Sequence, residues 1–489
     1  MSKNDGARVI PIAPAAVAAG AGDEETTEFL YQAHQKIYPR SVSGLFARWR
    51  WALVWLTQIV YYGLPWLTWG GRQAVLFDLA ARRFYIFGLV LYPQDFIYLT
   101  GLLVISAYSL FLFTAIGGRL WCGYACPQTV YTEIFLWVER KIEGDRIQRM
   151  RLDAAPWSLN KLWRKSAKQV AWVAISLWTG FTLVSYFTPA TQLLREAGTL
   201  GFGPWEWFWV LFYGFATYGN AGYMREQVCK YMCPYARFQS AMFDRDTLIV
   251  SYDAERGEPR GSRSRKADPK AAGLGSCIDC SLCVQVCPTG IDIRNGLQYD
   301  CIGCAACIDV CDSVMDKMNY PRGLIRYSTE NALEKHWGRG RILRRVLRPR
   351  ILIYSAILSL IVLGIGTSLL LRSPFRVDIV RDRNTLARMV EDGRIENVYR
   401  LQVMNATEST QRYQVHIVGL PQARITSQDQ VELSPAQAQW FPVSVQIPPE
   451  VAQQLGPGPH KVEFDIHRLP TPEQGEAVVK EHTTFIVPR

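Results

Sequence analysis

Charged residues are scarce in this sequence of 489 residues, and cysteine is absent from both of its ends. Asp, Glu, Lys and Arg make up only 20%, whereas hydrophobic residues make up 49% and aromatic residues 12%. This balance is typical of a chain partly surrounded by lipid, and it excludes a purely soluble enzyme. All twelve Cys lie between residues 122 and 311. A disulfide-rich secreted protein does not concentrate its thiols in this way, so we expect the cysteines to be ligands.

Long apolar runs with few ionisable residues are present, and each approaches the about 20 residues that a helix needs to cross a bilayer. The sequence predicts five spans: Trp51–Trp69, Phe96–Ile116, Val170–Phe187, Trp205–Tyr218 and Ile351–Leu371. The fourth run is short, and it is counted because the topology requires it. A buried core helix is the alternative for any single run. The pattern as a whole favours a multi-pass α-helical membrane protein of about five spans, with lipid as its surroundings.

The distribution of Lys and Arg predicts the orientation of these spans. Residues 139–168 hold nine basic side chains and residues 335–350 hold seven, whereas 71–94 hold three and 189–204 hold one. Because basic loops stay on the cytoplasmic side, the loops at 71–94 and 189–204 are expected outside. This placement predicts an N-terminus inside and a C-terminus outside, and it explains the net charge of +11 without a nucleic-acid partner.

Both ends of the chain are predicted to lie outside the lipid. Residues 1–48 contain no apolar run, which predicts a disordered cytoplasmic tail and no signal peptide. Residues 373–489 contain short alternating segments such as Val398–Met404 and Tyr413–Val418, separated by turn residues. That pattern is typical of an Ig-like β-sandwich, here on the outer side of the membrane, with a docking or spacer role. Residues 335–372 supply the basic segment and fifth span that precede it.

Eight cysteines form two matching runs in residues 246–334, a ferredoxin-like insert that the charge pattern places in the cytoplasm. Each run has the spacing C-x2-C-x2-C-x3-C of bacterial two-cluster ferredoxins, in which the last cysteine of one run ligates the cluster of the other. We therefore assign one [4Fe–4S] cluster to Cys277, Cys280, Cys283 and Cys311. The second is assigned to Cys301, Cys304, Cys307 and Cys287. Structural zinc is the alternative, because C-x2-C pairs also bind zinc.

The other four cysteines form a duplicated C-x3-C-P motif in the membrane core, residues 49–245. They are Cys122, Cys126, Cys229 and Cys233. A helical motif would put both sulfurs of a pair on one face, or the proline would begin the next helix. Repeated halves often build a site at their interface, and thiolates select Cu(I), zinc or Fe–S. A dithiol pair and buried packing are the alternatives. Glu133 and Glu139, which follow the first motif, are interpreted as solvated surface residues.

The two cysteine systems together resemble the CcoG/FixG/RdxA family of cytochrome c oxidase accessory proteins. The resemblance rests on the block from Gly118 to Pro127, the block from Cys229 to Pro234, the double ferredoxin run and the cysteine-free outer sandwich. NapH- and NosR-type membrane polyferredoxins are similar more distantly. The resemblance implies an inner-membrane protein needed for assembly of cbb3-type oxidase, linked to reduction of Cu(II) to Cu(I).

On this interpretation the chain is a cupric reductase in which electrons enter two [4Fe–4S] clusters from a cytoplasmic donor or membrane quinol. They reach copper at the four C-x3-C-P cysteines, and Cu(I) passes to a transporter, chaperone or oxidase assembly factor. The alternatives are a quinol-linked Fe–S conduit without copper and a redox-sensing assembly scaffold. The sequence leaves open the electron donor, and whether the two motifs meet within one chain or across a homodimer.

Overall fold

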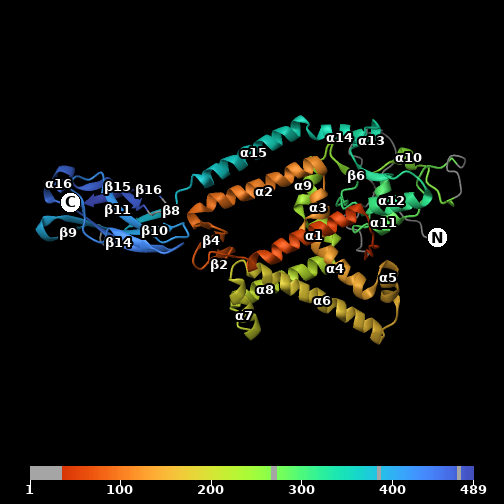
Figure 1. The fold of residues 1–489 in the computed structure, drawn as a ribbon, viewed down its shortest axis with the longest axis horizontal. Helices are drawn as coiled ribbons and strands as arrows, with labels where there is room; N and C mark the ends of the chain where they lie inside the picture. The colour runs from red at the N-terminus through yellow and green to blue at the C-terminus, as the bar shows by residue number, and fades with distance from the viewer. Residues whose placement is uncertain (1–35, 266–272, 383–386, 471–474, 489) are drawn as a thin grey trace, which may run out of the picture. The chain divides into compact units, whose positions relative to one another are not determined.

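The computed structural model describes residues 36–265, 273–382, 387–470 and 475–488. They belong to two compact units that alternate along the sequence (Figure 1). The first comprises Met1–Gly63, Leu102–Val184 and Ala197–Ile361, and the second comprises Leu64–Gly101, Ser185–Glu196 and Val362–Arg489. Most of the predicted disordered tail lies outside the described residues. Its predicted end at residue 48 is too late, because a helix already begins at Leu45.

The first unit is mainly helical. Its helices are α1 (Leu45–Gly63), α3 (Leu120–Tyr124), α4 (Pro127–Glu143), α5 (Arg146–Ala154), α6 (Leu159–Val184), α8 (Pro204–Thr217), α9 (Pro234–Met242), α10 (Ala254–Gly257), α11 (Leu282–Gln285), α12 (Ala306–Met318), α13 (Glu330–Glu334) and α14 (Arg339–Val346). Two π-helical segments, η3 (Tyr218–Met224) and η4 (Val228–Met232), follow α8. Three helices belong partly to each unit: α2 (Phe96–Gly117), α7 (Ala190–Thr199) and α15 (Pro349–Leu370).

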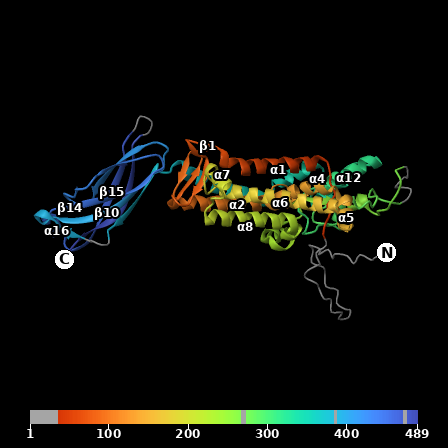
Figure 2. The same cartoon turned by 90° about the horizontal axis from the view of Figure 1, so that it is seen from below.

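Helices α6 and α8 lie side by side in the first unit (Figure 2). A Cβ atom on Gly180 of α6 would lie 2.3 Å from the backbone oxygen of Val210 in α8. Only glycine permits this close approach, as is common where helices pack within a membrane. Helix α1 joins the same group, because the Tyr61 hydroxyl donates to the backbone oxygen of Thr179 over 2.9 Å.

Among the described residues, two helical stretches are long and apolar enough to cross a membrane, Pro93–Gly117 and Pro349–Leu370. They correspond to the predicted second and fifth spans. The other three predicted spans are helical over much of their length, but they stay a prediction as spans. The predicted span Trp51–Trp69 is longer than its helix, since α1 ends at Gly63 and the chain then forms a short 3₁₀ turn and a strand.

The predicted ferredoxin insert is held at its ends by two short strands of the first unit. β6 (Ile249–Tyr252) pairs antiparallel with β7 (Ile325–Ser328), with Val250 opposite Tyr327. Side chains from these strands pack with Ile293 and Met315 in a core that also contains Cys277 and Cys283. The strands therefore fix both ends of the cysteine-rich loops against one hydrophobic core.

The second unit contains the predicted β-sandwich. One sheet has the strand order β12-β14-β10-β8, with β9 also paired to β10, and the other has the order β13-β11-β15-β16 (Figure 1). The strands are β8 (Phe375–Arg381), β9 (Arg388–Met389), β10 (Ile395–Asn405), β11 (Gln411–Val418), β12 (Arg424–Ile425), β13 (Gln430–Leu433), β14 (Ala438–Ile447), β15 (Gly458–Arg468) and β16 (Ala477–Val487), with α16 (Pro449–Leu455) between β14 and β15. Alternate residues of both sheets, such as Tyr399 and Phe464, fill the core. The alternation in the sequence predicted this correctly.

Short strands between α1 and α2 were not predicted. They are β1 (Thr68–Trp69), β2 (Arg72–Gln73), β3 (Val75–Asp78), β4 (Arg83–Ile86) and β5 (Leu89–Leu91). Tyr85 and Tyr92 of this segment pack against Met404 of the sandwich, within the second unit. Asp95, at the start of α2, is buried and pairs with Arg372 at 2.5 Å and with Arg376 at 3.0 Å.

Candidate functional site

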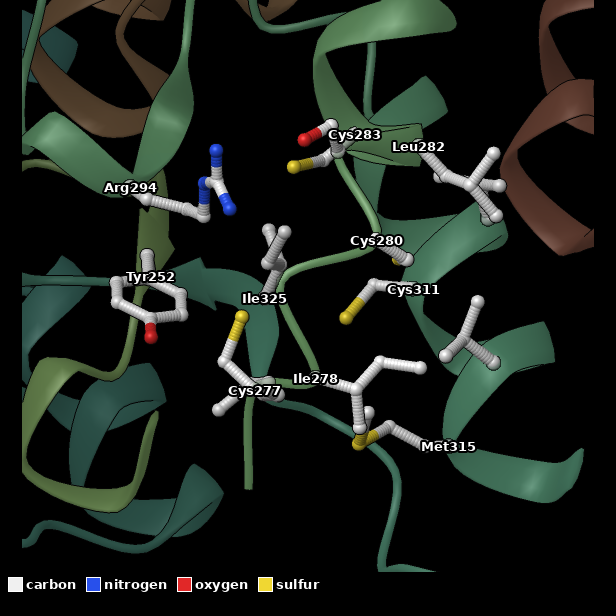
Figure 3. A pocket seen from close by; sticks show the side chains of 14 residues that line it. Tyr252, Cys277, Ile278, Cys280, Leu282, Cys283, Arg294, Cys311, Met315 and Ile325 are labelled. Atoms are coloured by element: carbon white, nitrogen blue, oxygen red, sulfur yellow. The ribbon is translucent and has the colours of Figure 1, made fainter. Parts of the chain in front are cut away.

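Four cysteines of the first unit line one cavity. Cys277, Cys280 and Cys283 come from the loop that leads into α11, and Cys311 comes from α12. The loop wraps around the cavity because Asp279 and Ser281 both adopt positive φ, 52° and 56°. The sulfur atoms of Cys277, Cys283 and Cys311 face a common space, with the guanidinium group of Arg294 across from them (Figure 3). The structure thus brings together the four residues that the spacing assigns to one cluster.

A second cavity is lined by the remaining ferredoxin cysteines, Cys287, Cys301, Cys304 and Cys307. Here too the last cysteine of one run joins three of the other. Gly303 and Ala305 adopt positive φ, 69° and 58°, so this loop repeats the turns of the first. Cys283 lines both cavities, which are therefore neighbours, as electron transfer between two clusters requires.

The donor set of each cavity fits a polynuclear cluster better than a single ion. Among the described residues, no three His, Cys, Asp or Glu side chains are grouped closely enough to hold one metal ion. A zinc site needs four sulfurs about 2.3 Å from the ion, whereas a [4Fe–4S] cube separates its thiolates widely. Each cavity is lined by four cysteines, three from one run and one from the other, as in a two-cluster ferredoxin.

Burial raises the pKa of several of the thiols that line these cavities, which favours their protonated form. It raises the pKa of Cys283 to about 11 and that of Cys311 to about 12, in the latter case helped by the charges of neighbouring thiolates. Burial likewise raises the pKa of Cys301 to about 12. Bonding to iron is what stabilises the thiolate in such a place, so cluster insertion releases protons.

The C-x3-C-P motifs each straddle a break between two helices. Pro127 and Pro234 begin α4 and α9, and the preceding Cys126 and Cys233 are the N-caps of those helices. The first members of the pairs lie in the preceding short helices, α3 and η4. Of the two arrangements considered from the sequence, the proline therefore starts the next helix, and a pair does not share one continuous helical face.

The duplication brings the four thiols of the two motifs near one another within one chain. Burial raises the pKa of Cys122 to about 11, and the charges of Cys126 and Cys233 add to this effect. Burial raises the pKa of Cys229 to about 12, and the charges of Cys126, Cys122 and Cys233 add to this effect. No three of these thiols form a single-ion site among the described residues, although a pair of thiolates suffices for Cu(I).

A buried amide contacts this group of thiols. Gln239 of α9 is fully buried, and its side-chain amide lies 3.5 Å from the sulfur of Cys122. The same amide nitrogen is 3.4 Å from the hydroxyl of Thr114 in α2. Thr129 of α4 donates to the backbone oxygen of Cys122 over 2.5 Å. These contacts hold Cys122 from three different helices, so its position is set by tertiary structure.

The four C-x3-C-P thiols lie next to the second ferredoxin cavity. A Cβ atom on Gly123 would lie 2.8 Å from the backbone nitrogen and Cα of Cys304, which glycine alone avoids. Cys122 and Cys229 pack against a core that contains Ile302 and Cys304. The backbone of one C-x3-C-P motif therefore contacts directly the loop that holds the second cluster cavity, and an electron has only a short distance to cross.

The charges of two buried arginines act on cysteines of the second cavity. Arg119 donates to the backbone oxygens of Tyr299 and, over 2.5 Å, of Ala236, and its charge acts on Cys301 as well as on Cys122. The charge of Arg50 in α1 acts on Cys304. Both side chains have an exposed fraction of only 8%. Neither was singled out from the sequence, because each becomes relevant only through its distant neighbours.

The interpretation of Glu139 as a solvated surface residue is wrong. Its side chain is 2% exposed and pairs with Arg149 and with Arg225, each at 2.7 Å. Burial alone would raise the pKa of Glu139, but the positive charges of Arg225 and Arg149 outweigh it and lower the pKa. Glu133 pairs with Arg140 at 3.2 Å and lines a cavity with Cys229 and Cys304. The mixture of apolar and charged residues in α4 did not indicate that its charged side chains would be buried.

Comparison with known protein families supports the iron–sulfur assignment. A family model described as "4Fe-4S dicluster domain" matches residues 224–330, and one described as "4Fe-4S binding domain" matches residues 99–144. A third, for the Ig-like fold at the C-terminal of FixG, matches residues 365–488. Both cysteine systems and the sandwich are therefore covered by matches.

Relatives of known name match most of the chain. The nitrogen fixation protein FixG of Rhizobium meliloti is 41% identical over 425 residues, covering 81% of each chain. Protein RdxA of Cereibacter sphaeroides is 41% identical over 401 residues, covering 80% of this chain and 84% of its own. A crystal structure of a FixG-related protein from Vibrio parahaemolyticus aligns with 24% of this chain and 97% of its own, at 21% identity and a TM-score of 0.20, which is too weak to support an argument. On the extent and identity of the first two matches, the chain belongs to the FixG/RdxA family and is an iron–sulfur protein.

Proposed function

We propose that this protein is a membrane-bound electron-transfer protein that reduces Cu(II) to Cu(I) for the assembly of a cbb3-type oxidase. The observation that carries the proposal is the contact of Gly123 with the backbone of Cys304. It joins a pair of soft thiol ligands to the loop of a cluster cavity, so that a metal held by the thiols could receive an electron over a short distance.

Each group of residues then has a distinct role. When bound, the two clusters supply one-electron transfer. Cys277, Cys280, Cys283 and Cys311 hold the first, and Cys287, Cys301, Cys304 and Cys307 hold the second. Cys122, Cys126, Cys229 and Cys233 bind the copper substrate, because thiolates favour Cu(I) over harder ions. Cu(II) gains one electron and no bond to the protein needs to break. Gln239 fixes the position of Cys122.

The membrane placement belongs to the same proposal. Residues 71–94 and 373–489, which are expected outside, fall in the second unit, and the basic segments and ferredoxin insert fall in the first. Residues 189–204, which are also expected outside, are divided between the two units. Helices α2 and α15, the two that are long and apolar enough, are both divided between the units, as is the shorter α7. This supports a cytoplasmic insert, a periplasmic sandwich and an inner-membrane location, with the remaining three spans as proposed.

A second candidate function has an observation in its favour. The 4Fe-4S binding match at residues 99–144 contains only Cys122 and Cys126. This favours a further iron–sulfur centre at the C-x3-C-P thiols, in an electron conduit that handles no copper. Iron analysis separates the two: two clusters correspond to about eight irons per chain, and a third [4Fe–4S] centre to about twelve.

The proposal is tested with anaerobically purified full-length protein. The clusters are reduced, Cu(II) is added, and cluster absorbance and Cu(I) are followed together with a Cu(I)-specific chelator. We expect one Cu(I) for each electron lost by the clusters. A Cys122→Ser, Cys229→Ser variant should keep about eight irons and lose the reaction, whereas Cys280→Ser should lose the first cluster. Equal rates in the wild type and the double variant would show that copper is an incidental oxidant.

A further inference from the structure

A large apolar cavity of about 990 Å³ lies in the first unit beside the second ferredoxin cavity. Its walls come from α1, α2 and α3, including Trp49, Leu53, Leu110, Phe113 and Trp121. Its size reaches the upper end of ordinary ligand sites. Helix α2 is one of the two helices long and apolar enough to cross a membrane, so this cavity is suited to a ligand that arrives from lipid.

One end of the cavity carries two phenol groups. The hydroxyls of Tyr124 and Tyr327 lie 3.2 Å apart, and both residues line the cavity. Tyr327 donates to the backbone oxygen of Gly303 over 2.6 Å. Because that proton is already committed, Tyr327 accepts from Tyr124 or from a ligand, and Tyr124 retains a lone pair for a ligand hydroxyl. Polar groups in an otherwise apolar cavity fix the orientation of a ligand.

These hydroxyls link the apolar cavity to the loop that lines the second ferredoxin cavity. Gly303 lies between Cys301 and Cys304 in the loop that lines the second ferredoxin cavity. Tyr124 is also the neighbour of Gly123, whose backbone contacts Cys304. A ligand bonded to Tyr124 would therefore lie one short hydrogen-bonded path from the second cluster. An acyl chain would fill the apolar walls equally well, but it would leave both phenol groups unused.

We propose that this cavity binds a membrane quinol, which is the electron donor to the second cluster. The quinol forms hydrogen bonds with Tyr124 and Tyr327 while its tail lies along α1 and α2. It loses two electrons and two protons to become the quinone. One electron goes to each of the two clusters, and the protons go to water. The inference deepens the proposed function by naming its donor, and it rests on the electron-transfer role but not on copper.

The charges around the second cavity favour electron transfer from the quinol to the second cluster. Arg50 and Arg119 are both buried, and their charges act on Cys304 and Cys301. Positive charge near a cluster stabilises its reduced form, which carries the additional electron, and so raises its reduction potential. These charges make the second cluster a suitable acceptor for electrons from a quinol, and it is the cluster nearest the cavity.

The inference is tested on full-length holoprotein with a decyl-substituted naphthoquinol under anaerobic conditions. We expect saturable bleaching of the cluster absorbance. Ala107→Trp, which fills the cavity from α2, should slow it at least about tenfold, while Leu103→Trp, on the same helix outside the lining residues, should not. Tyr124→Phe should slow it about fivefold to tenfold, as the loss of one hydrogen bond predicts.

A binding readout and a copper control complete the experiment. A photoreactive azido-quinone should label peptides within residues 105–125, and excess decyl-quinone but not phospholipid should protect them. Ala107→Trp reduced by dithionite should still convert Cu(II), which separates this inference from the copper proposal. Equal bleaching rates for Ala107→Trp and Leu103→Trp would overturn it. Protection by phospholipid alone would also overturn it and identify the cavity as an acyl-lipid site.

Discussion

Gly123 lies against the backbone of Cys304, so close that a Cβ atom there would be 2.8 Å from the Cys304 nitrogen. The two residues are far apart in sequence and belong to different cysteine systems. Their contact makes the C-x3-C-P thiols and the second ferredoxin cavity parts of one continuous site. A chain with the same motifs, but without this contact, would have two separate sites.

Replacing Gly123 by alanine should damage both sites at once. The methyl group would collide with the Cys304 backbone, which cannot move without opening the cluster loop, and overpacking of this kind costs about 1–3 kcal/mol. We expect a lower melting temperature, less iron and slower Cu(I) formation. Gly219→Ala is the matched control, because no atom lies within 4 Å of its Cβ position. Similar behaviour of the two variants would contradict the tight contact.

The arginines should tune the two clusters separately. Arg50→Gln removes a positive charge that acts on Cys304, so the potential of the second cluster should fall by tens of millivolts, with the first unchanged. Arg294→Gln should do the reverse, because Arg294 lines the first cavity and acts on Cys283. A redox titration monitored by EPR measures both potentials. If both variants shift the same cluster, the assignment of the arginines to cavities is wrong.

Glu139→Gln should strongly destabilise the first unit. It leaves Arg149 and Arg225 buried with only a neutral partner, and breaking such a pair costs about 3–5 kcal/mol. Chemical denaturation measures the loss. The matched control is Glu334→Gln, whose exposed pair with Arg245 should contribute no more than about 1 kcal/mol. A small effect at Glu139 would mean that water replaces the lost contacts.

The same carboxylate should make the first unit sensitive to acid. The pKa of Glu139 is lowered in the folded chain, so its contribution to stability is present above its ordinary pKa of 4.5 and is lost as the pH falls through the lower folded value. We expect the melting temperature to decrease when the pH is lowered below about 4.5. In Glu139→Gln this fall should be smaller. An unchanged pH profile in the variant would assign the acid sensitivity to other carboxylates.

Asp95→Asn should affect the second unit alone. The buried carboxylate holds Arg372 and Arg376, and its loss should cost about 3–5 kcal/mol in that unit. Iron content and Cu(I) formation should stay unchanged, because every cysteine lies in the first unit. Asp378→Asn is the control, since its bond to Gln94 is exposed. Loss of iron in Asp95→Asn would show that the two units do not fold independently.

Patterns in the sequence predicted those features that depend only on residues close together along the chain. The C-x2-C-x2-C-x3-C spacing predicted which cysteines surround each cavity, because three thiolates in a short loop can face only one cluster. Alternation of apolar residues predicted the sandwich, since neighbouring side chains of a strand point to opposite faces. The strands between residues 68 and 91 were missed because they are only two to four residues long, too short for a period to show.

The sequence by itself predicted the grouping of eight cysteines around two ferredoxin cavities and the C-terminal sandwich. Only the tertiary structure decided that the four C-x3-C-P thiols meet within one chain, that Gly123 contacts Cys304, and that Glu139 is buried. It also placed Arg50, Arg119 and the Tyr124–Tyr327 pair beside the second cavity. The reason is physical: spacing fixes what adjacent residues can bind, whereas burial, charge and distance at a site depend on residues that only folding brings together.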